Sequence, residues 1–359
     1  MSLRFGLLVF FLFNAFYSEA KILKKTDLKQ RIDKLIDGKD LVGLSLFLKQ
    51  GEEEFFIHFG EKKIESHQTA NDKSLYEIAS ITKLFTGLVL AKAMDQGKIN
   101  ENDLAQKYLN YKLPKKAGVE ISILDLATHR AGFSEKFLEG VELKDPLNPW
   151  ASFGVTELIN FLNRSPLDWI PGTQSRYDNI ASGILGDVLE KLYNKSLESI
   201  YRDELLDSMA MSATSIVPQG ESLNKAVQGY ALVESRLVAC PLWSFASMAA
   251  AGGLKSDIWD MSKWSRFVLN PPSQEWLRIL EIAQRPRRQT LALEAEQIGL
   301  LWRLMPSPYD MYWHNGGTYG MSSFFGVNKK KNSALVLLAN TMSDTTTGLG
   351  FELMKAINE

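Results

Sequence analysis

The sequence has almost no cysteine, since Cys240 is the only one among 359 residues. No internal disulfide can form, so a chain of this size must rely on its hydrophobic core for stability. The composition, 45% apolar and 23% charged, is typical of a globular protein with a substantial core. The length suits one elaborate domain or two interleaved subdomains.

The sequence also lacks a large net charge and histidines at the spacing typical of metal ligands. The net charge is −1, which disfavours a nucleic-acid binder that works by neutralising phosphates. The four histidines are scattered along the chain and no His-Glu-x-x-His motif occurs, so a metal enzyme is disfavoured. Gly-x-Ser-x-Gly is absent as well, which argues against the nucleophile elbow of the α/β-hydrolases.

A long apolar run occurs at the start of the chain. Residues 5–16 are apolar apart from one glycine and one asparagine, and Arg4 precedes them. Small residues then occupy the positions that signal peptidase reads, up to Ala20. This pattern predicts a secretory signal peptide over residues 1–20 and a periplasmic or secreted location. The run is short for a membrane span, although an uncleaved anchor is the alternative.

The rest of the chain changes its pattern along its length. Runs typical of β-strands lie near both ends, at residues 41–48, 55–59, 299–304, 310–313, 322–327 and 334–339. Helical patterns fill the middle, with an irregular excursion over the surface expected at residues 134–154. This order predicts an α/β (α+β) fold, in which an antiparallel sheet made from both chain ends is flanked by helices and carries an inserted, mostly helical subdomain.

We expect one catalytic domain over residues 21–359. Its α/β part should cover residues 21–79 and 245–359, and its helical part residues 80–244.

A serine and a lysine stand three residues apart before an apolar run. Residues 84–94 are nearly all apolar or small, which predicts a buried helix with Ser80 and Lys83 side by side at its N-terminal end. A hydroxyl next to an amine that a dry site keeps partly neutral can act as a nucleophile. The same Ser-x-x-Lys motif at residues 18–21 and 222–225 is not followed by an apolar run that would form a buried helix. Taken alone, Ser80 fits the role of a helix-starting serine better.

Two further motifs follow later in the chain. Tyr177-x-Asn179 directly precedes an apolar helical pattern at residues 180–192, although residues 108–110 carry the same spelling. The last motif has four consecutive residues, His314, Asn315, Gly316 and Gly317. It follows an aromatic strand, so we expect it at a sheet edge where glycines allow close approach. Each motif is weak or moderate alone, whereas the three in this order are much more specific.

In this order the three motifs resemble those of the serine β-lactamase and penicillin-binding protein superfamily, in its class C-like branch. Residues 126–133, 169–186 and 250–254 are similar to further segments of that family. The resemblance covers roughly residues 30–355 and implies the β-lactamase/transpeptidase-like fold. Within the first of these segments, we expect His129 to fix a turn rather than to catalyse.

The resemblance implies a role for each catalytic residue, with no cofactor. Ser80 is the expected acyl-forming nucleophile. Lys83 and Tyr177 are expected to move the proton from Ser80 to the leaving group, since a buried lysine and a tyrosine beside a cation can share a proton. Asn179 is expected to hold the substrate's amide carbonyl and to orient Lys83.

The strand motif is expected to bind substrate. The resemblance implies an oxyanion hole from the backbone N–H groups of Ser80 and Gly317, next to Gly316. His314 stands where many relatives have lysine and is expected to face the substrate's carboxylate, partly charged at neutral pH. Asn315 replaces the usual threonine or serine, so a hydroxyl that grips the carboxylate is missing.

These departures bear on the expected substrate. Efficient β-lactamases of this branch generally keep lysine and threonine in the last motif, whereas D-Ala-D-Ala peptidases, D-amino-acid peptidases and esterases often carry histidine. Asp178, where relatives have serine, also disfavours a carboxylate-bearing substrate if it points into the site.

We therefore predict a secreted serine hydrolase, foremost a D-Ala-D-Ala carboxypeptidase acting on peptidoglycan stem peptides. The alternatives are a class C-like β-lactamase, an esterase or D-aminopeptidase, and a non-catalytic peptidoglycan-binding homologue. The expected partner is a small-molecule or peptide substrate, with no nucleic acid and no stable membrane span after signal cleavage.

Overall fold

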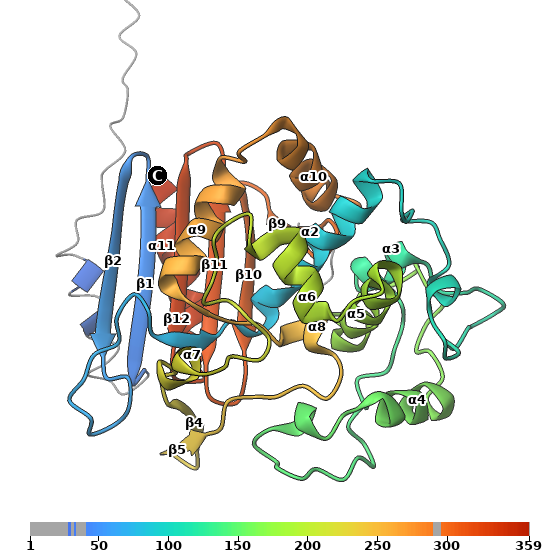
Figure 1. Cartoon of the computed structure of the whole chain (residues 1–359), viewed down its shortest axis with the longest axis horizontal. Coiled ribbons are helices and arrows are strands. Elements are labelled where there is room, and N and C mark those ends of the chain that lie inside the picture. Colours follow the sequence, from blue (N-terminus) through green and yellow to red (C-terminus); the bar gives the residue numbers. More distant parts are fainter. Residues whose placement is uncertain (1–27, 30–31, 34–40, 290–295, 359) are drawn as a thin grey trace, which may run out of the picture.

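The computed structural model describes residues 28–29, 32–33, 41–289 and 296–358. Its centre is an antiparallel sheet of eight strands in the order β2-β1-β12-β11-β10-β9-β8-β7 (Figure 1). These strands are β1 (Gly43–Gln50), β2 (Glu53–Gly60), β7 (Arg288–Gln289), β8 (Gln297–Ile298), β9 (Arg303–Met305), β10 (Met311–Gly317), β11 (Ser322–Asn328) and β12 (Ser333–Ala339). Strands from the two ends of the described chain thus share one sheet, which confirms the predicted fold class.

Helices surround this sheet and fill the middle of the chain. They are α2 (Thr82–Asp95), α3 (Ile123–Ala127), α4 (Val155–Arg164), α5 (Asn179–Tyr193), α6 (Leu197–Tyr201), α7 (Glu221–Asn224), α8 (Ala249–Gly252), α9 (Ile258–Leu269), α10 (Gln274–Gln284) and α11 (Thr345–Asn358). Two small sheets pair β3 (Leu75–Glu77) with β6 (Lys255–Asp257), and β4 (Gly229–Val233) with β5 (Arg236–Cys240). None of the helices within the described ranges has the length and hydrophobicity of a membrane span.

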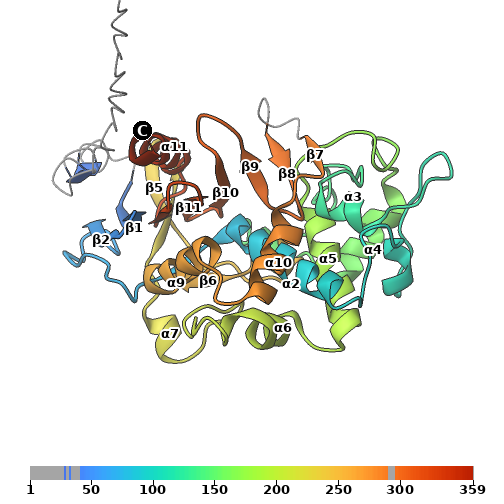
Figure 2. The same ribbon diagram turned by 90° about the horizontal axis from the view of Figure 1, so that it is seen from above.

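The central strands are buried on both faces because helices cover both (Figure 2). Successive side chains of a strand point to opposite faces, so Phe324 packs under α11 and Phe325 toward α2 and α9. Leu335 and Val336 divide in the same way one strand further on. Complete burial of such a side chain stabilises the fold by roughly 1.5–3 kcal/mol.

Helix α2 passes through the middle of the molecule, as the apolar run predicts, with its residues from Thr82 to Ala91 fully buried. Gly87 allows this position, because a Cβ there would lie 1.9 Å from the carbonyl oxygen of Leu300. The indole of Trp302 also donates to the carbonyl of Leu84 over 3.1 Å. The turn at residues 299–302 therefore holds the helix against the sheet.

Three expectations change in detail. The strand expected at residues 299–304 begins at Arg303, because Leu301 adopts a left-handed φ of 62° and residues 299–302 form a turn. The strand expected at residues 310–313 continues to Gly317, since its second half pairs with β11. The excursion at residues 134–154 is irregular as expected, but its aromatic side chains at 150 and 153 are buried. The predicted signal peptide lies outside the described residues.

Candidate active site

Ser80 lies in a short 3-10 turn, η1 (Ala79–Ile81), between β3 and α2. Ala79 adopts a left-handed φ of 47°, a conformation that costs an alanine roughly 1–2 kcal/mol. Hydrogen bonds on Ile78 hold this corner: its N–H donates to Leu254 over 3.1 Å and its carbonyl accepts from the Ser323 hydroxyl over 2.9 Å. The chain therefore turns sharply at Ala79 and presents Ser80 at the head of α2.

Lys83 is completely buried one helical turn after Ser80. Its Nζ donates to Ser80 Oγ at 3.2 Å, to Asn179 Oδ1 at 2.8 Å and to the carbonyl of Ala251 at 2.6 Å. Burial lowers the pKa of Lys83 well below its ordinary value, although the charge of Asp178 raises it. The amine is thus able to be neutral beside the serine and to accept its proton.

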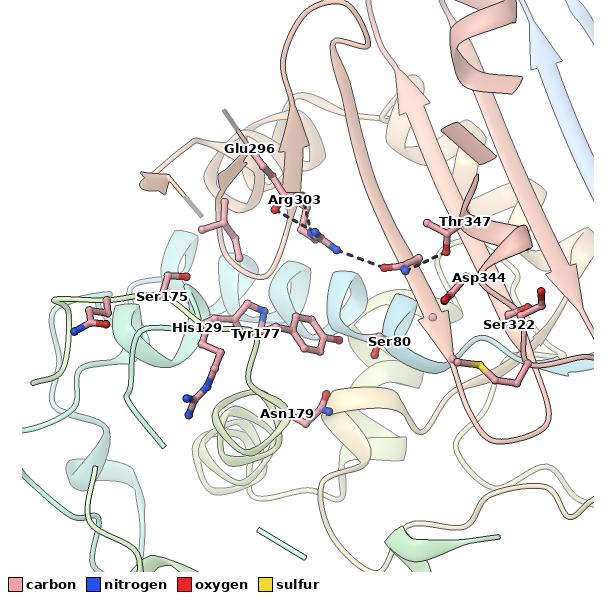
Figure 3. Close-up of a pocket in the computed structure, with 18 of the residues that line it drawn as sticks. Ser80, His129, Ser175, Tyr177, Asn179, Glu296, Arg303, Ser322, Asp344 and Thr347 are labelled. Atoms are coloured by element: carbon pink, nitrogen blue, oxygen red, sulfur yellow. Dashed lines mark hydrogen bonds and ion pairs between the residues drawn. The ribbon is translucent and has the colours of Figure 1, made fainter. Parts of the chain in front are cut away.

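Tyr177 completes this cluster from the loop before α5. Its hydroxyl points toward that of Ser80 (Figure 3). Nζ of Lys83 lies 4.7 Å from the centre of the tyrosine ring. Loss of water around its hydroxyl raises the pKa of Tyr177 to about 12, although 38% of the residue is exposed, and the nearby Ser80 hydroxyl lowers it. A protonated tyrosine and a neutral lysine are therefore the favoured forms, so Tyr177 can donate a proton and Lys83 can accept one.

Asn179 is the first residue of α5, and the preceding Asp178 caps that helix. The Asp178 carboxylate accepts a hydrogen bond from the backbone N–H of Ala181 over 3.0 Å. Burial raises the pKa of this carboxyl to about 7. Asp178 is not among the described residues that line the cavity around Ser80, so its carboxylate serves the helix rather than pointing at substrate.

His314 does not occupy the position expected of it. Only 1% of its surface is exposed, and it is absent from the described residues lining the cavity. Its Nδ1 lies 2.5 Å from the carbonyl oxygen of Asn315, and its ring centre 6.0 Å from that of Tyr177. Burial and the charge of Arg303 lower the pKa of His314 well below its ordinary value. The ring is therefore neutral and lies behind the tyrosine, not partly charged in front of the substrate.

His129 has the structural character expected of it. It adopts a left-handed φ of 57°, and its Nδ1 accepts a hydrogen bond from the backbone N–H of Asp178 over 3.3 Å. Burial lowers the pKa of His129 to about 3. Its ring centre lies 4.8 Å from that of Tyr177, so the turn at His129 packs against the tyrosine.

The glycines of the last motif lie where β10 approaches η1. Strand β9 pairs with residues 311–313 of β10, so residues 314–317 have one open side. A Cβ on Gly316 would lie 2.5 Å from the carbonyl oxygen of Ile78 and 3.0 Å from the Ala79 side chain. Glycine at 316 thus permits the close approach of β10 to the turn that carries Ser80.

A cavity of about 800 Å³ opens in front of Ser80 (Figure 3). Its walls are formed by Ser80, His129, Trp169, Gln174, Ser175, Arg176, Tyr177, Asn179, Glu296, Ile298, Arg303, Asn315, Gly316, Gly317, Ser322, Met342, Ser343, Asp344 and Thr347. Ser80, Tyr177, Asn179 and the last three residues of the strand motif therefore meet at one cavity. In the part of the chain that the structure describes, no His, Cys, Asp and Glu side chains gather as metal ligands.

Arg303 on β9 is one of the cavity residues that the motifs do not indicate. Its guanidinium bonds Glu296 through two nitrogens at 2.7 and 3.1 Å and lies 4.0 Å from the ring centre of Trp313. Its third nitrogen, Nη1, lies 3.4 Å from the Asn315 side-chain oxygen. Asn315 in turn donates to the Thr347 hydroxyl over 3.1 Å. Figure 3 shows this polar row crossing the cavity mouth from β9 to α11.

A family model described as Beta-lactamase matches residues 28–355. The D-alanyl-D-alanine-carboxypeptidase/endopeptidase AmpH of Escherichia coli (strain K12) is 25% identical over 267 residues, which make up 74% of this chain and 66% of that protein. The chain thus spans slightly less than two thirds of the length of AmpH. A protein named beta-lactamase from Pseudomonas fluorescens is 24% identical over 298 residues, covering 79% of this chain and 76% of that one.

Solved structures show the same fold. The beta-lactamase/D-alanine carboxypeptidase from Yersinia pestis, complexed with citrate, has a TM-score of 0.78 at 22% identity and covers 93% of this chain and 100% of that one. The octameric penicillin-binding protein homologue from Pyrococcus abyssi has a TM-score of 0.80 at 21% identity, over 94% of this chain and 79% of that one.

Proposed function

Because the chain belongs to the beta-lactamase family, as its three motifs predict, we propose that it is a serine hydrolase acting through an acyl-enzyme on Ser80. The observation that carries this proposal is the position of the Ser80 hydroxyl, 3.2 Å from the Nζ of a completely buried Lys83. Relatives named carboxypeptidase and beta-lactamase support the same reaction class.

The reaction begins when Ser80 Oγ attacks the substrate's carbonyl carbon. The neutral amine of Lys83 takes the hydroxyl proton as the bond forms. The negative charge that develops on the carbonyl oxygen is stabilised by the backbone N–H groups of Ser80 and Gly317, each worth roughly 3 kcal/mol in other acyl-transfer enzymes. Asn179 holds the substrate's amide carbonyl and keeps Lys83 in place.

The tetrahedral intermediate then loses its leaving group. Tyr177 gives its proton to the leaving nitrogen or oxygen and is reprotonated by the Lys83 ammonium, so the enzyme ends with both groups neutral. Water attacks the ester on Ser80 in the second half of the reaction, and the same groups carry its proton in the reverse direction. The carboxylic acid product is then released, as the amine or alcohol product was before it, and the Ser80 hydroxyl regains its hydrogen.

The favoured substrate is a peptide ending in D-Ala-D-Ala, as in peptidoglycan stem peptides. Tyr177, the proton donor, lines the large cavity, so the leaving group lies there, within reach of Arg303, Asn315 and Thr347. The Arg303 guanidinium, the Asn315 amide and the Thr347 hydroxyl carry hydrogen-bond donors that suit a terminal carboxylate. Arg303 takes the role expected of His314, and Thr347 supplies the hydroxyl that Asn315 lacks. We also propose a periplasmic or secreted location, on the strength of the predicted signal peptide.

A fluorescent penicillin tests the nucleophile. We expect one covalent adduct on Ser80, located by peptide mass spectrometry, and its loss in Ser80→Ala together with all hydrolysis. Ser222→Ala is the matched control, because residues 222–225 repeat the same Ser-x-x-Lys spelling, and it should label normally. An adduct on another residue, or hydrolysis by Ser80→Ala, would contradict the mechanism.

The lifetime of that adduct separates the two candidate activities. An adduct that persists indicates a D-Ala-D-Ala peptidase, whereas rapid release of opened penicillin indicates a β-lactamase, the second candidate, which the relatives of that name favour. The carboxylate contact is tested by comparing a peptide ending in D-Ala-D-Ala with its C-terminal amide. The acid should be cleaved with a kcat/KM about tenfold higher or more, since a charge-assisted hydrogen bond contributes roughly 1.5–3 kcal/mol. Equal values would remove Arg303 from substrate binding.

A further inference from the structure

Two buried side chains of α2 bind consecutive carbonyl groups of α8. Lys83 donates to the carbonyl of Ala251 over 2.6 Å. Thr86, on the next turn of the same helix, donates to the carbonyl of Ala250 over 2.8 Å. Both side chains are 0% exposed. The position of the Ala251 carbonyl relative to the lysine amine therefore depends on how firmly the residue before it is held.

The contacts of Lys83 suit both protonation states of its amine. An ammonium group carries three hydrogens, and Nζ has three acceptors, which are Ser80 Oγ at 3.2 Å, Asn179 Oδ1 at 2.8 Å and the Ala251 carbonyl at 2.6 Å. A neutral amine keeps only two hydrogens. Because the two carbonyl oxygens can only accept, they retain those hydrogens, and the lone pair of the amine faces the Ser80 hydroxyl. The amine is therefore ready to take the serine proton without turning.

The Ala251 carbonyl belongs to a helix of only four residues, α8. Such a helix has few hydrogen bonds of its own, because the first N–H groups and the last carbonyls of a helix have no partner within it. Its carbonyls are therefore placed by groups outside it. On the α5 side, a Cβ on Gly186 would lie 2.7 Å from the Cβ of Ala250, so glycine lets α5 pack closely against α8. On the α2 side, the hydroxyl of Thr86 holds the Ala250 carbonyl.

Tyr201, the last residue of α6, sets the direction of the Thr86 hydroxyl. The two hydroxyl oxygens lie 2.6 Å apart, and Tyr201 is 0% exposed. Among the described residues the Tyr201 hydroxyl has no other hydrogen-bond partner, and burial raises its pKa, so it keeps its hydrogen and donates it to Thr86. Thr86 is then free to donate its own hydrogen to the Ala250 carbonyl, since the other acceptor, the Thr82 carbonyl, is further away at 3.2 Å.

Building on the proposed serine hydrolase, we propose that Thr86 and Tyr201 are positioning residues for its proton acceptor. They fix the backbone of α8, so that the Ala251 carbonyl holds one hydrogen of the neutral amine and the lone pair of Lys83 stays aimed at Ser80. Among the described residues that line the two cavities at Ser80, neither Thr86 nor Tyr201 occurs. They therefore act on proton transfer and not on substrate binding.

Thr86→Val removes the hydroxyl and keeps the shape of the side chain. Acylation of Ser80 by a fluorescent penicillin, followed up to saturating concentrations at a series of pH values, separates the acylation rate constant from the affinity. The rate constant on the high-pH plateau should fall about tenfold or more, because a small displacement of a catalytic group is costly, while the affinity stays unchanged.

The midpoint of the pH profile should also move to lower pH in Thr86→Val. The ammonium form of Lys83 loses an acceptor that stabilises its charge, which lowers the pKa of the amine further. The charged groups that act on Lys83, those of Asp178 and Arg303, are the same in the variant. A shifted midpoint therefore reports the Ala251 carbonyl, and a merely structural role of Thr86 would leave it in place.

Two further variants and a control complete the test. Thr86→Ser restores the hydroxyl and should return the rate constant and the midpoint close to the wild-type values. Tyr201→Phe should shift both in the same direction as Thr86→Val but less, because Thr86 keeps its own hydrogen, and it tests the proposal if Thr86→Val does not fold. Ser265→Ala is the matched control and should change neither quantity, since Ser265 on α9 is also 0% exposed and donates to a backbone carbonyl, that of Met261, over 2.9 Å.

The outcomes separate this proposal from the one on which it rests. An unchanged rate constant and midpoint in folded Thr86→Val and Tyr201→Phe, with the adduct on Ser80, would overturn the positioning role alone. A slower reaction with a lower melting temperature but an unmoved midpoint would overturn it as well, because that pattern is purely structural. Labelling that survives Ser80→Ala would instead contradict the proposed serine hydrolase.

Discussion

Lys83 and Lys255 are the two least exposed lysines among the described residues, and their surroundings differ. Lys83 is 0% exposed and Lys255 is 3% exposed. Burial lowers the pKa of both amines. Lys255 donates to the carbonyls of Ile216 at 3.1 Å and Trp243 at 2.6 Å, and the charge of Glu77 opposes its shift. Lys83 instead donates to the hydroxyl of Ser80, which lines a cavity.

The difference shows that burial alone does not mark a functional lysine. Glu77 stands directly opposite Lys255 in the β3–β6 pair and its charge acts on that amine, so the second lysine has an acidic neighbour within the core. The acid whose charge reaches Lys83 is Asp178, which is occupied as the cap of α5. A buried cation beside a nucleophile and without a dedicated carboxylate is suited to releasing its proton, whereas Lys255 is suited to holding two strands together.

The largest effect is expected from removing the amine of Lys83. Lys83→Met should lower kcat/KM about 10²–10⁴-fold, the usual contribution of a positioned proton acceptor. The melting temperature should stay equal or rise, because an amine that is costly to bury is replaced by an apolar side chain of similar length. Steady-state kinetics and thermal unfolding of the same preparation measure both. A melting temperature well below that of the wild type would mean that Lys83 is structural after all.

Lys255→Met should show the reverse pattern. Removing the amine leaves the buried carbonyls of Ile216 and Trp243 without their donor and Glu77 without its positive neighbour, which should cost about 1–3 kcal/mol in the free energy of unfolding. Activity per folded molecule should stay within about tenfold of the wild type. Denaturant unfolding measures the loss. The double variant with Glu77→Gln should regain part of it, and strict additivity of the two changes would show that the pair does not interact.

The pH dependence of stability should report the lowered pKa of Lys83. The pKa of Lys83 is lowered in the folded state, so the unfolded chain, with a lysine pKa of about 10.4, binds more protons between the two values. Stability should therefore rise with pH across that interval, and Lys83→Met should flatten the rise. Unfolding free energies at a series of pH values from neutral to about 10 test this. The kcat/KM of the wild type should also rise as Lys83 loses its proton and level off below the ordinary lysine pKa.

The smallest expected effect concerns Glu77 itself. Its carboxylate accepts from the Thr318 hydroxyl over 2.7 Å, and burial raises its pKa. Glu77→Gln keeps the shape and one acceptor, so we expect a loss of about 1 kcal/mol of stability and little change in kcat/KM. Calorimetry and kinetics measure the two. A large drop in kcat/KM with unchanged stability would place Glu77 in the catalytic machinery and remove the contrast with Lys83.

Much of the site was predictable because its signals are local. An apolar run indicates a buried helix wherever it lies, and residues 80 and 83 are neighbours on any helix. The family motifs then supplied partners at 177, 179 and 314–317. The division of the domain into residues 21–79 with 245–359, and residues 80–244, stays a prediction.

The parts that were not predictable depend on strand register and on which side chains of a strand point to which face of the sheet. His314 and Asn315 point to opposite faces of β10, and since helices cover both faces, the spelling of the motif does not tell which residue reaches the cavity. Arg303 belongs to a strand of three residues and reaches the site through its pairing with Trp313. The buried rings of Trp150 and Phe153 lie in an irregular segment, where no periodicity indicates burial.

The pairing of β1 with β12 determines how much of the chain must be made before the active site can be complete. Val42 and Thr341 are hydrogen-bonded although they are 299 positions apart, and the strand that faces Ser80 is β10. While a ribosome is still making the chain, Ser80 and Lys83 are finished long before residues 311–339 exist. Pairings of such long range form late in folding. A partly made copy therefore carries its serine and lysine without the strand that completes the site.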